Sequence, residues 1–218
     1  MSQITERFAA LRTRNEAGLV AFITAGDPNL ETTAALVCEF ARVGVDVVEL
    51  GVPFSDPLAD GPTIQAASER ALKAGTTVEG VLSLVSGLRG EGVTIPIVLM
   101  TYYNPMLQFG LERFAQACAG AGVDGVIATD LPPEEGSRWI AAARAHRLDT
   151  IFLLAPTSTE ARVEAVAKAT TGFIYCVARL GVTGARDTVP EELGDLITRI
   201  RKHTSTPIAA GFGFSQPE

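Results

Sequence analysis

Three carboxylates stand close together in the stretch VVELGVPFSDPLADGP, residues 47–62. Glu49 lies inside an apolar run, and Asp56 and Asp60 follow within the next eleven positions. A carboxyl group in apolar surroundings is desolvated, which raises its pKa and lets it exchange a proton near neutral pH. A carboxylate in a polar loop rich in backbone N–H groups keeps its charge. Glu49 and Asp60 therefore predict an acid/base pair, in which Glu49 moves the proton and Asp60 stays ionised.

The same carboxylates also have a structural interpretation. Glu49 could end a strand through a salt bridge, because structural ion pairs also place acids near cores. Asp56 stands in Ser-Asp-Pro, which is ordinary turn chemistry and favours a structural role. Strand alternation places Val45, Val47 and Glu49 on one face. The catalytic interpretation requires that this face line an enclosed interior.

The elements that position these residues alternate along the chain. Amphipathic helical stretches separate apolar runs that predict parallel strands covered by helices. The first helix is expected over residues 1–17, ended by Gly18, and Ser/Thr-x-x-Glu boxes at 76–79, 157–160 and 188–191 predict later helix starts. The predicted strands are 19–24, 45–50, 96–100, 124–129, 150–155, 172–178 and 207–212.

This rhythm predicts one α/β domain over residues 1–218, a (β/α)8 TIM barrel, with an open doubly wound sheet as the alternative. Barrel active sites lie at the carboxyl ends of the strands and in the loops that follow them. Glu49 is the penultimate residue of the second predicted strand, and Asp60 closes the next loop. Both carboxylates are therefore expected at the mouth of the barrel.

Composition excludes several classes of function. The net charge is −7 without a basic block, which argues against nucleic acid or an anionic membrane as partners. No apolar run approaches the ~20 residues of a membrane-spanning helix. Three widely spaced cysteines predict reduced core residues in a cytoplasmic protein. His146 and His203 each stand beside a basic residue, so neither a metal site nor a histidine-based triad is expected.

The stretch VELGVPFSDPLADGP resembles the signature of the tryptophan synthase α subunit. The resemblance continues in order along nearly the whole chain, with one block at the end of almost every predicted strand. The further blocks are AFITAGDP (21–28), LMTYYNP (99–105), ATDLPPEE (128–135), GFIYCVARLGVTGAR (172–186) and AGFGFS (210–215).

The resemblance implies cleavage of indole-3-glycerol phosphate to indole and glyceraldehyde 3-phosphate. Protonation of indole C3 turns the ring into a leaving group and places positive charge on the ring nitrogen. Glu49 would deliver that proton and then take one from the side-chain hydroxyl. Asp60 would hydrogen-bond N1–H and stabilise the charge. This chemistry needs no metal and no organic cofactor in this chain.

Further site residues follow from the resemblance. Tyr175 would orient Glu49, and Thr183 would hold Asp60 when the loop at 178–189 closes, although Tyr175 also reads as an ordinary core tyrosine. Aromatic residues would line the indole pocket, and glycines would bring backbone N–H groups to the phosphate. These substrate-binding residues are Phe22, Tyr102 and Phe212, with Gly184, Gly211 and Gly213.

The resemblance also implies a partner, a β subunit that uses pyridoxal phosphate and receives the indole within an α2β2 heterotetramer. The docking positions would lie in the loop after the second strand and in a turn after the third. They are Pro53, Phe54, Asp56, Asn104 and Pro105.

The predicted barrel is incomplete. A full barrel has eight strands and about 250 residues, whereas this sequence carries seven predicted strands. The eighth strand and the later phosphate loop are therefore expected to be missing, leaving an open and less stable barrel. Two other functions remain open: another phosphate-binding barrel enzyme, such as a sugar-phosphate isomerase, and a non-catalytic subunit that only stimulates the β subunit.

Overall fold

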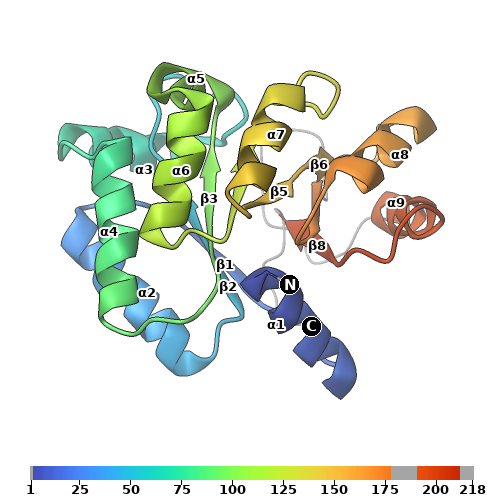
Figure 1. The fold of residues 1–218 in the computed structure, drawn as a ribbon, viewed down its shortest axis with the longest axis horizontal. Helices are drawn as coiled ribbons and strands as arrows, with labels where there is room; N and C mark the ends of the chain where they lie inside the picture. Colours follow the sequence, from blue (N-terminus) through green and yellow to red (C-terminus); the bar gives the residue numbers. More distant parts are fainter. Residues whose placement is uncertain (1, 178–190, 212–218) are drawn as a thin grey trace.

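The computed structural model of the chain describes residues 2–177 and 191–211, and helices surround parallel strands in it (Figure 1). Nearly every strand is followed by a helix that returns the chain to the start of the next strand. The elements in order are α1 (Gln3–Arg14), β1 (Val20–Thr24), α2 (Leu30–Val43), β2 (Val47–Gly51), α3 (Pro62–Lys73), α4 (Val78–Gly90), β3 (Ile97–Thr101), α5 (Tyr103–Phe109), α6 (Leu111–Ala121), β4 (Gly125–Ala128), α7 (Ser137–Ala145), β5 (Asp149–Ile151), β6 (Leu153–Leu154), α8 (Glu160–Ala169), β7 (Ile174–Val177), α9 (Glu191–Arg201) and β8 (Ile208–Gly211).

The strands pair in chain order and in parallel, as β1-β2-β3-β4-β5 and β6-β7-β8. β5 and β6 together form the fifth predicted strand, interrupted at Phe152, whose carbonyl still accepts a hydrogen bond from the Tyr175 backbone at 3.1 Å. All seven predicted strands are confirmed. The doubly wound alternative is wrong, because a doubly wound sheet reverses its strand order and this chain does not.

The interior of the barrel is apolar. Side chains from the strands meet there with Ile4 of α1, which is fully buried. Val47 belongs to this inner cluster, whereas Val48 and Leu50 pack outward against the helices. The predicted alternation along β2 is therefore confirmed, except that Val45 precedes the strand and packs outward. The inner cluster comprises Ile4, Val47, Val98, Met100, Ile127, Ile151, Phe173 and Tyr175.

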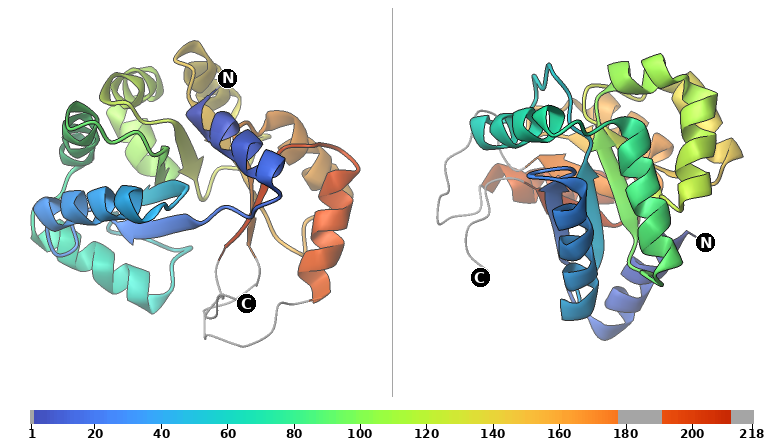
Figure 2. Two further views of the ribbon diagram at one scale, coloured as in Figure 1. Left: turned by 90° about the horizontal axis from the view of Figure 1, so that it is seen from below. Right: turned by 90° about the vertical axis from the view of Figure 1, so that its left-hand side faces the viewer.

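Helix α1 lies across the end of the barrel at which the strands begin (Figure 2). Its N-cap residue, Ser2, donates a hydrogen bond to Asp149 at the start of β5, with a distance of 2.5 Å between Oγ and Oδ2. On the other flank, Arg12 Nη2 approaches the Ser205 carbonyl at 3.5 Å, just before β8. Within the described residues, β1 and β8 form no ladder with each other.

Several predicted helix boundaries are displaced. The prediction that Gly18 ends the first helix is wrong: α1 ends at Arg14, where Asn15 takes the left-handed conformation and caps it. The N-caps of α4 and α8 are Thr77 and Thr159, one and two residues later than the sequence boxes indicate. In each case a neighbouring threonine offers the same hydroxyl, so the motif alone does not select the cap.

All three cysteines are free, as predicted, and Cys118 and Cys176 are fully buried. No described helix is long and apolar enough to cross a membrane. In the part of the chain that the structure describes, no group of three or more His, Cys, Asp or Glu side chains is arranged to hold a metal ion.

Candidate active site

Glu49 lies inside the barrel, near the carboxyl end of β2. Its neighbours in register are Phe22 on β1 and Val98 on β3. The side chain is only 2% exposed, and this burial raises its pKa to about 8. Its Oε1 atom has no hydrogen-bond partner among the described residues. The predicted apolar pocket is therefore confirmed, and the carboxyl group is protonated near neutral pH.

Tyr175 enters the same interior from β7 and is 6% exposed. Burial raises the pKa of its phenol, and the negative charge of Glu49 raises it further. A Cβ atom on Gly211 of β8 would collide with the Tyr175 hydroxyl, so this position has to be glycine for Tyr175 to lie as it does. The role of Gly211 that the structure shows is thus to make room for Tyr175, and its contact with phosphate stays a prediction.

Asp60 stands at the mouth, in the loop between β2 and α3. Its Oδ2 accepts a hydrogen bond from the Tyr102 hydroxyl at 3.1 Å, and that hydroxyl accepts one from the Ala59 backbone at 2.9 Å. Burial raises the pKa of Asp60, and the bond from Tyr102 opposes the rise. The predicted backbone donors are not among its described partners. The ionised form is stabilised instead by a tyrosine from the end of β3.

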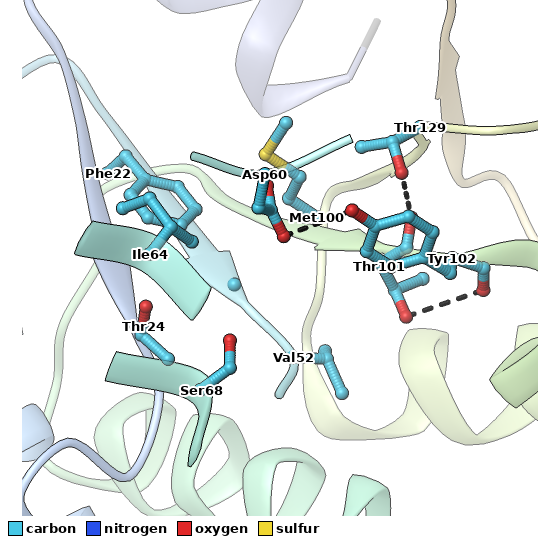
Figure 3. A pocket seen from close by; sticks show the side chains of 11 residues that line it. Phe22, Thr24, Val52, Asp60, Ile64, Ser68, Met100, Thr101, Tyr102 and Thr129 are labelled. Carbon is cyan, nitrogen blue, oxygen red and sulfur yellow. Dashed lines mark hydrogen bonds between the residues drawn. The ribbon is translucent and has the colours of Figure 1, made fainter. Parts of the chain in front are cut away.

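A pocket that Asp60 and Tyr102 line lies at the carboxyl ends of β1, β2 and β3 (Figure 3), and Phe22, the register neighbour of Glu49, is in its wall. Its volume is about 280 Å³, including space open to solvent. The Phe22 ring lies directly over Gly51, where an added Cβ would come within 2.7 Å of it. Asp60 reaches across the pocket toward Tyr102 in Figure 3. The lining residues are Phe22, Thr24, Gly51, Val52, Asp60, Ile64, Ser68, Met100, Thr101, Tyr102 and Thr129.

The structure thus brings most of the predicted site residues to one end of the barrel. Thr183, Gly184, Phe212 and Gly213 lie outside the described residues. The sequence reasoning missed Thr24 and Ser68, which both line the pocket. Alternation could have found Thr24, because it stands two residues after Phe22 on the same face of β1.

The predicted docking residues lie beside the pocket. Pro53 is buried, Asp56 is exposed, and the half-buried Phe54 packs on Tyr102 with 5.4 Å between the ring centroids. Asn104 and Pro105 are in the first turn of α5, not in the predicted turn. Asp130 stabilises the start of this helix, because its Oδ1 accepts a hydrogen bond from the Tyr103 backbone N–H at 2.7 Å.

One apolar side chain in the same loop was missed. Leu58 is 93% exposed, and Leu107 of α5 is 43% exposed. The sequence signal that could have found Leu58 is a large apolar residue directly after Pro57 in a short loop. Contact with an apolar partner would remove the Leu58 side chain from water.

Comparisons with known proteins agree with this geometry. The family model described as tryptophan synthase alpha chain matches residues 8–218. The chain is similar to the tryptophan synthase alpha chain of Geotalea uraniireducens, with 54% identity over 217 residues that cover 100% of this chain and 81% of the relative. The corresponding protein of Geobacter sulfurreducens is 52% identical, over 100% of this chain and 82% of that relative.

Solved structures show the same likeness. A chain of Mycobacterium tuberculosis tryptophan synthase superimposes with a TM-score of 0.90 at 39% identity, covering 97% of this chain and 80% of that one. A chain from the Pyrococcus furiosus tryptophan synthase α2β2 complex gives a TM-score of 0.85 at 38% identity, covering 91% and 79%.

Proposed function

The chain belongs to the tryptophan synthase alpha chain family and acts in tryptophan synthesis; from this premise we propose that it is a carbon–carbon lyase that cleaves indole-3-glycerol phosphate to indole and glyceraldehyde 3-phosphate. The observation that carries the proposal is the pairing of a fully buried Glu49 with Asp60 at the mouth of the same barrel. The sugar-phosphate isomerase alternative is not favoured, because the family match spans residues 8–218.

Glu49 is suited to be the proton carrier. With a pKa raised to about 8 it holds its proton at neutral pH. Its Oε1 has no hydrogen-bond partner among the described residues that a substrate would have to displace. It gives the proton to C3 of the indole ring, which becomes an indolenine cation. The resulting carboxylate then takes the proton of the adjacent side-chain hydroxyl. As the carbonyl forms, the electrons of the breaking carbon–carbon bond return to the ring, and neutral indole leaves.

Asp60 stabilises the cation. An ionised carboxylate near the ring nitrogen offsets the positive charge that C3 protonation creates there. Tyr102 supports this role because its hydroxyl donates to Oδ2 and opposes the rise in the pKa of Asp60 that burial causes. Phe22 and Met100, which line the same pocket, supply apolar surface for the flat ring. Thr183, which lies outside the described residues, would hold Asp60 during loop closure.

The partner in this proposal is a β subunit, bound in an α2β2 assembly and carrying pyridoxal phosphate for the next reaction. No cofactor is proposed for this chain. The docking surface consists of Phe54, Asp56 and Leu58 of the loop after β2, with Asn104 and Pro105 of α5. Its support is the exposed Leu58 and the α2β2 complex formed by the Pyrococcus furiosus relative.

The test is the release of free indole. The chain, alone and with a β subunit, is incubated with indole-3-glycerol phosphate. We expect Glu49→Gln to slow indole release by about 10²- to 10⁴-fold, because an amide cannot carry the proton. Glu91→Gln, at an exposed glutamate, is the matched control and should release indole at the wild-type rate. Normal turnover by Glu49→Gln would refute the assignment. If indole appeared only when a β subunit was present, and if Glu49→Gln did not change its rate of release, the non-catalytic alternative would be supported.

A further inference from the structure

Two hydroxyl groups form a polar floor in the pocket. Thr24 stands at the end of β1 and Ser68 on α3; both line the pocket, and they are 7% and 5% exposed. In Figure 3 their oxygen atoms lie below Phe22 and Ile64, apart from the Asp60–Tyr102 pair. The floor therefore belongs to the pocket but not to the predicted acid/base machinery.

The Thr24 hydroxyl lacks a hydrogen bond. Its Oγ1 is fully buried and has no partner among the described residues. A buried hydroxyl without a partner is unfavourable, because it has lost water and gained nothing in return. Thr24 is in this respect like Thr170, which is also buried and unpartnered but ends α8, away from the pocket. Of these two described residues, Thr24 is the one that lines the pocket, so a ligand there has a buried hydroxyl without a partner beside it.

The chemistry of the floor selects a neutral group. Threonine and serine hydroxyls each donate and accept a hydrogen bond and carry no charge. Asp60 lines the same pocket and would repel an anion. The walls above the floor are apolar, with Phe22, Ile64 and Met100 among them. A flat aromatic ring that bears one hydroxyl group satisfies both the walls and the floor.

Building on the proposed function, in which the pocket takes the indole ring, we propose that Thr24 and Ser68 form a specificity subsite for one hydroxyl substituent on that ring. The subsite makes the pocket more favourable for a ring-hydroxylated indole than for indole itself. It takes no part in the proton transfers that Glu49 and Asp60 carry out.

The test compares indole with the set of hydroxyindoles that carry the hydroxyl on the benzene ring, titrated into the full chain and followed by ligand-observed NMR. We expect at least one hydroxyindole to bind about 3- to 10-fold more tightly than indole, the gain of one net hydrogen bond. If no hydroxyindole binds more tightly, the floor is closed to ligands, as it would be with a firmly held water molecule, and the proposal is wrong.

Variants identify the groups that recognise the hydroxyl. Thr24→Val keeps the shape of the side chain and removes its hydroxyl, and Ser68→Ala removes the other. Each should reduce the preference for the hydroxyindole, and together they should abolish it while indole still binds. Thr170→Val is the matched control, since it removes an equally buried, unpartnered hydroxyl outside the pocket and should leave the preference intact. A preference that survives in the folded double variant would overturn the proposal.

Two safeguards keep the result decisive. Circular dichroism checks that each variant folds, and if Thr24→Val does not, Ser68→Ala and the double variant Ser68→Ala/Thr24→Ala carry the comparison. Failure of indole itself to bind the chain, with no indole released from indole-3-glycerol phosphate, would count against the proposed function. Normal indole release without a hydroxyindole preference would count against the subsite alone.

Discussion

At the scale of single residues, burial decides the chemistry of Glu49. An acid whose pKa is higher in the folded protein than in the unfolded chain holds a proton that the unfolded chain releases. The pKa of Glu49 rises from 4.5 to about 8 on folding. Its contribution to stability is therefore complete below pH 4.5 and is progressively lost as pH rises to about 8.

This pH dependence can be measured. In the wild type, Glu49 should reduce the free energy of unfolding by up to about 1.4 kcal/mol per pH unit across that window. Glu49→Gln has no proton to lose, so its urea-unfolding free energy should fall less steeply with pH than that of Glu91→Gln. Parallel curves for the two variants would show that Glu49 does not titrate as its burial indicates.

The hydroxyl of Tyr102 has a role that the position of this residue in the sequence does not reveal. It was predicted as a wall of the pocket, and it is one, but its hydroxyl also ties together Ala59 and Asp60. These residues are 42 and 43 positions away in the chain, so no local pattern connects them. Only the pairing of β2 with β3 brings them together.

Removing that hydroxyl should affect catalysis more than binding. We expect Tyr102→Phe to lower the rate of indole release by about ten-fold, because a hydrogen bond to a charged group is lost while the aromatic ring stays. The affinity for indole should hardly change. Tyr103→Phe, a tyrosine that does not line the pocket, is the control. Steady-state kinetics check both, and a change confined to KM would contradict this role.

At the scale of elements, the sequence predicted strands better than helix ends. The seven apolar runs became strands because each has to be buried between helices and the barrel interior, and a side chain facing the wrong way would meet water or a packed core. Helix ends depend on which of several neighbouring hydroxyls or left-handed residues is used. Thr77 and Thr159 are the N-caps of α4 and α8, and Asn15 is the C-cap of α1, so these helix ends differ from the predicted ones by one to three residues.

The loop after β2 is an element with two faces. Phe54 packs inward on Tyr102, and Leu58 points into solvent. We expect Leu58→Ser to weaken binding of a β subunit by about ten-fold or more, the size of an interface hot spot, without lowering the melting temperature. Leu19→Ser, at another exposed leucine before β1, is the control and should bind normally.

Calorimetric titration of both leucine variants into a β subunit measures this effect. Phe54→Ala differs from Leu58→Ser in a way that can be observed, because it should weaken docking and also slow indole release through the loss of its contact with Tyr102. Unchanged affinity in Leu58→Ser would remove this residue from the interface.

At the scale of the whole molecule, one partly buried arginine joins elements that lie far apart in sequence. Arg89 of α4 donates to the Gly122, Val93 and Ile95 carbonyls, and its Nη2 is 2.7 Å from Asp124 Oδ2. The same aspartate oxygen accepts the Ile97 backbone N–H at 2.8 Å. This cluster fixes the starts of β3 and β4, at the end of the barrel opposite the pocket.

Breaking the cluster should therefore cost stability and not chemistry. We expect Arg89→Ala to lower the free energy of unfolding by about 3 kcal/mol, the low end for a buried ion pair, because it leaves the partly buried Asp124 without its cation and three carbonyls without their donor. Arg42→Ala, at an exposed arginine paired with Glu39, should leave the free energy of unfolding nearly unchanged, because solvent screens this pair. Urea unfolding measures both, and equal losses would show that the cluster is no more than a surface ion pair.

The position of helix α1 across the starts of the strands bears on how substrate and product move. Ile4 closes that end of the barrel, and the pocket opens at the other. The loop that carries Phe54 and Leu58 lies beside the pocket, because Phe54 packs on Tyr102 of the pocket wall. A subunit that docks on this loop would therefore lie next to the place where the pocket releases its product.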